Sequence, residues 1–311
     1  MHKVYCSFNF LGKVIIIKDL AKIILFVFLL GIGFFACGDS DNTEQNFYNN
    51  WVETGPGLSK DVEKNVLTEF VGSTKCPYCP LSDSLLVSYF NPDHQNYVGS
   101  DVTKKWFIIN YHTYHPSAGD PLYEFLRGGT AEEDFCYIRF GEGGQGEWYN
   151  VGGVPTVYTN GQYSSVSQNM YSYQMDQKTP VSINLEGSSI DGPIAQVRVS
   201  ISSSTDLSQE NSLYLFIAAT LDSVNYKGYN GQKHHEGVFL GWINDGLEGE
   251  LLSLENKEYT KSYLWEMPNN YPQNNQETSW TEVDWDIKNL KIIAFLQNKS
   301  SKEILQVQGF K

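Results

Sequence analysis

Hydrophobic and polar positions follow two different periods along this chain, and the period changes near residue 178. Before that point, stretches with helical spacing alternate with short apolar runs suited to buried strands, at 65–71, 106–111 and 156–158. After it, apolar residues recur at every second position in short runs separated by Asn, Gly, Ser and Asp. The pattern predicts an α/β domain over 61–178 and an all-β antiparallel sandwich over 180–311.

The elements predicted before residue 178 have a definite order. The strand at 65–71 precedes a helix whose apolar positions are Leu81, Leu85, Leu86, Tyr89 and Phe90. The strand at 106–111 is followed by short helices within 120–127 and 132–140, the strand at 156–158, an Asn160-Gly161 turn, a strand at 162–166 and a helix at 167–176. Strand, helix, strand, crossover, hairpin, helix is the order of a thioredoxin-like domain.

The beginning of the chain has the pattern of an export signal. Lys13, Lys18 and Lys22 form a basic region before an apolar run at 23–35, and that run ends just before Ala36-Cys37. This arrangement predicts a lipoprotein signal peptide over 1–36, with Cys37 carrying the lipid and a polar tether over 37–60. The alternative, an uncleaved membrane anchor, is disfavoured because the apolar run is shorter than the roughly 20 residues that span a bilayer.

The charge of the chain limits its partners. The sequence has a formal net charge of −14, and the signal removes four basic residues but only one acid, so the mature chain is more acidic still. Without a basic cluster, nucleic acid and anionic lipid are unsuitable partners, and attachment to the membrane has to be covalent. The sequence has no phosphate-binding loop, and we expect no cofactor.

The cysteines leave one pair available for chemistry. Of the five, Cys6 belongs to the signal and Cys37 to the lipid, so Cys76, Cys79 and Cys136 remain. So few cysteines do not form a disulfide-stapled scaffold. We expect Cys136 to be a buried core thiol, with a regulatory disulfide as the alternative.

Cys76-Pro77-Tyr78-Cys79 is predicted to be the reactive segment. A thiol exposed at a helix N-terminus has a stabilised thiolate, so Cys76 is expected to be the nucleophile and Cys79 the resolving thiol. The positive charge of Lys75, directly before Cys76, is also expected to stabilise the Cys76 thiolate. Two alternatives remain open, a structural disulfide and a soft-metal site, such as Cu(I), that adds His112 and His115; we expect no resident metal.

Two further residues are candidates for the same site. A cis Val154-Pro155 bond would present a backbone edge to the thiols and to a substrate peptide, whereas an ordinary trans proline opening a strand is the alternative. Glu69 precedes Cys76 by seven residues and is either a buried proton acceptor for the resolving thiol or a surface glutamate. The His234-His235-Glu236 run is interpreted as a polar turn ahead of a strand.

The run 67–80, with its Glu-Phe-x-Gly and Cys-x-x-Cys-Pro pattern, resembles the signature of the outer-membrane protein twenty-eight-related family of Bacteroidetes. Segments 109–112 and 153–156 also resemble landmarks of that family. The resemblance implies a thioredoxin-like domain joined to a β-domain, anchored by lipid to the outer membrane on its periplasmic or surface face. The chain departs from the pattern by one extra residue before Cys76 and by a long 112–153 segment, interpreted as a lid or partner-binding insertion.

Two functions fit these features. The first is a possible enzyme, a thiol–disulfide oxidoreductase acting on thiols or disulfides of exported proteins. The second is a surface binding or adhesion lipoprotein that uses the fold as a scaffold for a surface ligand, because one fold can serve many tasks.

Overall fold

The computed structural model describes residues 9–10, 13–14, 58–124, 134–141, 146–189, 194–244, 246–254, 257–266, 283 and 287–310. Contacts divide the chain into two units, 1–53 and 54–311. In the first unit, β1 (Asn9–Phe10) pairs antiparallel with β2 (Lys13–Val14). The rest of the predicted signal peptide, Cys37 and residues 37–57 of the tether lie outside the described residues. Within the described residues, no helix has the length and apolarity needed to cross a membrane.

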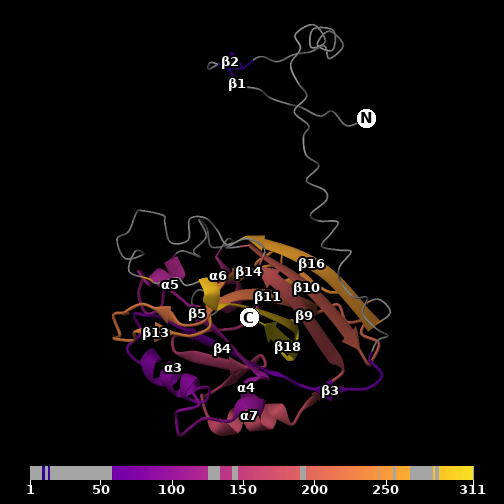
Figure 1. Cartoon of the computed structure of the whole chain (residues 1–311), viewed down its shortest axis with the longest axis horizontal. Helices are drawn as coiled ribbons and strands as arrows, with labels where there is room; N and C mark the ends of the chain where they lie inside the picture. The colour runs from indigo at the N-terminus through magenta and orange to yellow at the C-terminus, as the bar shows by residue number, and fades with distance from the viewer. Residues whose placement is uncertain are drawn as a thin grey trace. The chain divides into compact units, whose positions relative to one another are not determined.

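The second unit contains more strand than helix (Figure 1). Its strands are β3 (Val62–Glu63), β4 (Val66–Gly72), β5 (Trp106–His112), β6 (Thr156–Thr159), β7 (Gln162–Ser164), β8 (Lys178–Thr179), β9 (Val181–Ser189), β10 (Ile194–Ser203), β11 (Leu213–Leu221), β12 (Val224–Asn225), β13 (His234–His235), β14 (Val238–Trp242), β15 (Glu250–Leu251), β16 (Glu258–Glu266), β17 (Leu290–Asn298) and β18 (Ile304–Phe310). Its helices are α3 (Cys79–Ser88), α4 (Ser100–Thr103), α5 (Pro121–Glu124), α6 (Phe135–Phe140), α7 (Gln168–Met175) and the 3₁₀ turn η5 (Ile287–Asn289).

One mixed sheet organises this unit. Its strand order is β18-β17-β11-β14-β5-β4-β6-β7, with β15 paired to β11. Strand β4 lies in the interior, parallel to β5 and antiparallel to β6, and all seven of its residues are buried. Both faces of β4 are therefore covered, and its two polar residues, Thr68 and Glu69, are buried with the apolar ones.

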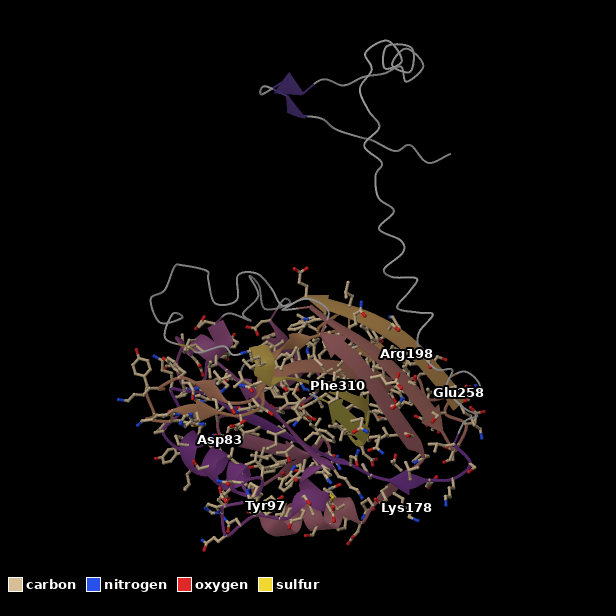
Figure 2. All side chains as sticks on the ribbon, in the orientation of Figure 1. Asp83, Tyr97, Lys178, Arg198, Glu258 and Phe310 are labelled. Atoms are coloured by element: carbon tan, nitrogen blue, oxygen red, sulfur yellow. A yellow bond between two sulfur atoms is a disulfide. The ribbon has the colours of Figure 1, made fainter. Side chains whose placement is uncertain are left out.

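A second sheet, β16-β10-β9, is antiparallel and packs on part of the first (Figure 2, where Arg198 and Glu258 mark it). Its inward residues, such as Leu185 and Val197, share a core with Leu215 and Ile217 of β11. The intervening Phe216 belongs to a different core on the opposite face of the large sheet. This alternation is the period-two pattern of the sequence, and it produces the expected face-to-face packing of antiparallel strands.

The large sheet crosses the predicted boundary between the two domains. Strand β14 pairs in parallel with β5, with Val238 opposite Asn110, and the Asn110 N–H donates a hydrogen bond to the Gly237 carbonyl at 2.7 Å. One layer of the expected sandwich is therefore the continuation of the α/β sheet and not a separate sheet. Sequence periodicity detects strands but not their lateral neighbours, which is why this junction was not predicted.

The described parts of the 112–153 segment, which are 112–124, 134–141 and 146–153, contribute buried residues to the core, and its interpretation as a lid or partner-binding insertion stays a prediction. Helix α6 begins with Asp134 accepting a hydrogen bond from the Cys136 N–H at 2.8 Å, an ordinary N-cap. Phe135, Phe140 and Trp148 are buried in the core on the face opposite α3. The predicted helix at 120–127 is observed only as α5, since residues 125–133 lie outside the described residues.

The β6–β7 turn packs against residues of the second predicted domain, and this contact can be tested by substitution. Gly161 has φ +85, and a Cβ added there would lie 1.7 Å from the carbonyl oxygen of Lys302. Gly161→Ala should therefore lower the free energy of unfolding by about 1–3 kcal/mol in denaturant titrations. Gly152→Ala is the control, because a Cβ there has no atom within 4 Å. Equal stability of the two variants would contradict this packing.

Candidate functional site

Cys76 and Cys79 form a disulfide at the beginning of α3, with their Cα atoms 5.4 Å apart. The helix begins at Cys79, and Pro80 occupies its first turn, where a missing N–H is tolerated. The Cys79 N–H donates to Cys76 Sγ at 3.1 Å. The sequence therefore identified the position of this pair correctly, at the carboxyl end of β4 and the start of a helix.

The expectation that Cys76 is exposed is wrong. Cys76 is 1% exposed and Cys79 is 2% exposed, and both belong to the core between the sheet and α3. Their neighbours in the sequence are very different, since Tyr78 is 74% exposed and Leu81 is 80% exposed. The surface near the disulfide is therefore aromatic and aliphatic, while the sulfur-bearing residues lie beneath it.

The proline loop reaches the same core. The Val154–Pro155 peptide bond is cis, the geometry expected from the sequence. Val154 packs against the cluster that contains Cys76, Cys79 and Phe70. Thr156, the first residue of β6, pairs with Val71 of β4, so the loop precedes a strand that lies next to the C-x-x-C strand.

A buried polar cluster lies at the carboxyl ends of β4 and β5. Asp120 Oδ2 accepts hydrogen bonds from the Thr74 N–H at 2.8 Å and shares one with His112 Nδ1 at 2.9 Å. Burial acts to raise the pKa of Asp120, but the charge of His112 and the bonds from His112, Thr74 and Leu122 outweigh it and lower that pKa. The Asp120 carboxylate therefore fixes the backbone just before Lys75.

Asp83 is a functional candidate that the sequence reading missed. It lies one helical turn after Cys79, and its carboxylate accepts hydrogen bonds from Asn110 Nδ2 at 3.3 Å and Gln232 Nε2 at 2.5 Å. Burial raises its pKa to about 6, against the opposing effects of His112 and Gln232. A buried acid with a pKa near neutral, one helical turn after a disulfide cysteine, is a candidate proton carrier. In the sequence, Asp83 could have been recognised as a candidate because it lies four residues after Cys79, on the same face of the predicted helix.

His235 is also a member of this cluster, although its sequence was interpreted as a polar turn. Its ring lies 5.3 Å from that of His112, centroid to centroid, and its Nε2–H donates to the Tyr226 carbonyl at 3.1 Å. Burial, together with the neighbouring His112, lowers its pKa to about 3, so His235 is neutral at physiological pH. The sequence alone gave no sign that strand β13 lies over β5.

Glu69 is not part of the site. Its carboxylate is fully buried in an ion pair with Arg139 and also accepts hydrogen bonds from the hydroxyls of Tyr111 and Tyr149. Side chains alternate across β4, so Glu69 shares the face of Leu67 and Val71, whereas Phe70 lies with the cysteines. The carboxylate therefore points away from the disulfide, and the proton-acceptor assignment is corrected.

The remaining candidate residues do not assemble a metal centre. His112 binds Asp120, and within the described ranges no group of three or more His, Cys, Asp or Glu residues is placed to hold a metal ion. Cys136 is the buried core thiol that was expected, and its Sγ lies 3.4 Å from the His112 carbonyl oxygen. Burial raises the pKa of this thiol well above its ordinary value.

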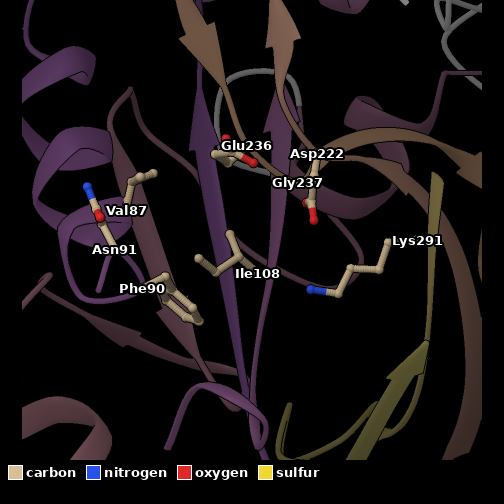
Figure 3. Close-up of a pocket in the computed structure, with 8 residues that line it drawn as sticks. All are labelled: Val87, Phe90, Asn91, Ile108, Asp222, Glu236, Gly237 and Lys291. Atoms are coloured by element: carbon tan, nitrogen blue, oxygen red, sulfur yellow. The ribbon is translucent and has the colours of Figure 1, made fainter. Parts of the chain in front are cut away.

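A groove, here called the α3 groove, lies between α3 and the 230–237 segment. One cavity of about 630 Å³ extends from Pro80 and Asp83 to Glu236, and it adjoins a cavity of about 360 Å³ that it meets at Val87, Asn91 and Glu236. In Figure 3, the side chains on and after α3 face Asp222 and Lys291 across Ile108. The smaller part of this α3 groove combines apolar side chains, such as Phe90 and Ile108, with charged ones, whereas the lining of the larger part is mostly polar. Both volumes are in the range of ordinary ligand sites.

Comparisons place this architecture among known structures. No protein-family model matches the chain, and no curated protein matches it. HBP35 of Porphyromonas gingivalis is 14% identical over 80% of this chain and 75% of that chain, with a TM-score of 0.58. The chain shares its fold with HBP35. A domain of the outer membrane lipoprotein Omp28 from the same organism is 16% identical over 43% of this chain and 88% of that chain, at a TM-score of 0.29, too low to show a shared fold.

The Glu69–Arg139 pair generates a prediction about stability and not about redox chemistry. Arg139→Met leaves the buried Glu69 carboxylate without its counter-ion, which should cost about 3–5 kcal/mol in denaturant unfolding. Adding Glu69→Gln should recover part of this loss. A change in the pH dependence of the C-x-x-C pair in Glu69→Gln alone would contradict the placement of Glu69 outside the site.

Asp83 generates a prediction about pH. Its pKa is about 6 in the folded chain, above the ordinary value of 3.8, so the folded state binds the proton more tightly than the unfolded state. Its contribution to stability is complete below about pH 4 and is lost as pH rises to about 6. Asp83→Asn should therefore be more stable than the intact chain by about 2–3 kcal/mol at pH 7 and equally stable at pH 4. Urea unfolding at both pH values measures this, and a difference independent of pH would contradict it.

Proposed function

We propose that this chain is an envelope lipoprotein whose Cys76–Cys79 pair exchanges disulfides with exported proteins. One observation carries the proposal: the two cysteines are bonded at the start of α3 and share a packed cluster with Val154 of the proline loop. A thiol at a helix start has its thiolate stabilised, and that favours exchange over a static role.

The arrangement of strands and helices between residues 61 and 178 supports a thioredoxin-like domain there. The strands lie in the order β5-β4-β6-β7, with β4 and β5 parallel and β6 and β7 antiparallel to their neighbours, and this arrangement supports the assignment. Helix α3 connects β4 to β5 and α7 follows β7, as expected. The fold shared with HBP35 is compatible with this assignment.

The location belongs to the same proposal. The apolar run before Cys37 supports a lipid anchor, and the resemblance of segment 67–80 to the Bacteroidetes family supports the outer membrane as its site. The acidic composition supports partners that are exported proteins, and not nucleic acid.

The α3 groove favours a second candidate function. With about 630 Å³ in its larger, mostly polar part and apolar side chains in its smaller part, it suits a surface ligand, and the disulfide would then be a structural bridge. The two functions differ in one measurable property, because a structural bridge resists reduction and an exchanging pair does not.

Trapping of partner proteins as mixed disulfides distinguishes these two functions. Cys79→Ser removes the resolving thiol, so Cys76 should retain partner proteins as mixed disulfides in cell envelopes, visible on non-reducing gels. Cys76→Ser is the matched control and should retain none. An absence of trapped proteins, together with a reduction potential below about −300 mV in the intact chain, would support the structural bridge instead.

A further inference from the structure

A loop from the part of the chain after residue 180 covers the backbone of the C-x-x-C motif. This 226–233 loop connects β12 and β13, and Asn230 lies at its tip. The Asn230 N–H donates to the Thr74 carbonyl at 3.0 Å, and its Nδ2 donates to the carbonyls of Ser73 at 3.2 Å and Cys76 at 3.1 Å. One residue therefore binds three backbone acceptors in the segment that ends at the first cysteine.

The loop has its own hydrogen bonds, which hold Asn230 in this position. Asn230 Oδ1 accepts from the Gln232 N–H at 3.0 Å, and the Gly228 N–H donates to the Gln232 carbonyl at 2.8 Å. Gly228 lies so close to Thr74 that an added Cβ would meet the Thr74 carbonyl oxygen at 3.1 Å. The contact is thus made by a closely fitted turn against the C-x-x-C backbone.

Two side chains of the loop, Tyr229 and Gln232, contact residues before and after the two cysteines. Lys75 Nζ lies 3.4 Å from the centre of the Tyr229 ring, a cation–π contact directly before Cys76. Gln232 Nε2 binds the Asp83 carboxylate, which lies one turn into α3. The loop therefore spans from the residue before the first cysteine to the buried acid after the second, while both cysteines are at most 2% exposed.

We propose that the 226–233 loop controls access to the disulfide and that Asn230 is its positioning residue. This inference rests on the proposed exchange and adds that a partner dithiol reaches the sulfurs only after Asn230 releases the Ser73 and Cys76 carbonyls. The released carbonyls are hydrogen-bond acceptors, so the backbone N–H groups of an extended partner segment can replace Asn230.

After release, a dithiol of the partner protein serves as the reductant and supplies both electrons for reduction of the Cys76–Cys79 disulfide. A partner thiolate attacks Cys76 Sγ, which forms a mixed disulfide and expels Cys79 as a thiolate that takes up a proton. The second partner thiol, after losing its proton, attacks the partner sulfur of the mixed disulfide and expels the Cys76 thiolate. Two electrons pass to this chain, and the partner leaves as a disulfide.

The test is the rate at which dithiothreitol reduces the disulfide in the purified, folded full chain, followed by alkylation and mass shift. Asn230→Ala removes the side-chain bonds to both carbonyls, so opening should become easier and reduction about 10–100-fold faster. Asn184→Ala is the matched control, because Asn184 is an exposed residue of β9 that bonds Glu186. An Asn230→Ala rate equal to that of the intact chain would overturn the proposal.

Local opening is distinguished from general loss of stability by a second readout and a second variant. The faster reduction of Asn230→Ala should change little in low urea, whereas reduction through global unfolding would accelerate with urea and would also overturn the proposal. Tyr229→Ala should fold normally because Tyr229 is 77% exposed, and its reduction should be about 2–5-fold faster. No acceleration in Tyr229→Ala would count against the loop as the cover.

Failure of this inference differs from failure of the proposed function. Trapping by Cys79→Ser with an unchanged Asn230→Ala rate removes the loop and retains the exchange. A faster Asn230→Ala rate with no trapped partner retains the loop as the cover of the disulfide and removes the exchange.

Discussion

The parallel pairing of β14 with β5 is the constraint on which the rest of this structure depends. A single short ladder, marked by the Asn110 N–H bond to the Gly237 carbonyl, makes one sheet of two segments that differ in sequence pattern. The chain enters β14 from β13, so this pairing also positions the β12–β13 hairpin at the carboxyl ends of β4 and β5. The disulfide at the start of α3 lies at the same edge, and the cover of that disulfide therefore follows from how the sheet is extended.

The two carboxylates of the polar cluster at this edge are compensated by hydrogen bonds. Asp120 accepts bonds from the backbone of Thr74 and from His112, while Asp83 accepts bonds from Asn110 and Gln232. Buried carboxylates are costly without such partners. The two acids nevertheless differ, since hydrogen bonds and His112 lower the pKa of Asp120, and burial raises that of Asp83 to about 6. An acid that titrates near neutral pH is thus held close to a disulfide by residues from both segments.

The opposite face of the sheet has a different role. Arg139 is fully buried, and the Glu69 carboxylate, opposing the effect of burial, raises the pKa of its guanidinium. Aromatic rings surround the guanidinium, including Phe216 at 4.7 Å and Tyr149 at 5.1 Å from its central carbon. This ion pair joins α6 to β4 on the face of the sheet opposite α3. Glu69 illustrates how neighbours in sequence are separated by a sheet: Phe70 lies against the cysteines, and Glu69 lies behind them.

The sequence by itself determined what depends on local order and periodicity. It placed strands β4, β5 and β6, the helix after Cys79, the Asn160-Gly161 turn and the alternating strands after residue 180, because side-chain period and turn chemistry are local properties. It also identified the C-x-x-C pair and the proline loop. Only the tertiary structure decided that Cys76 is buried, that Glu69 faces Arg139, and that Asn230 binds the Cys76 carbonyl while Gln232 binds Asp83. These relations join residues as far apart as 76 and 230, and they follow from lateral strand pairing, which period-two alternation does not encode.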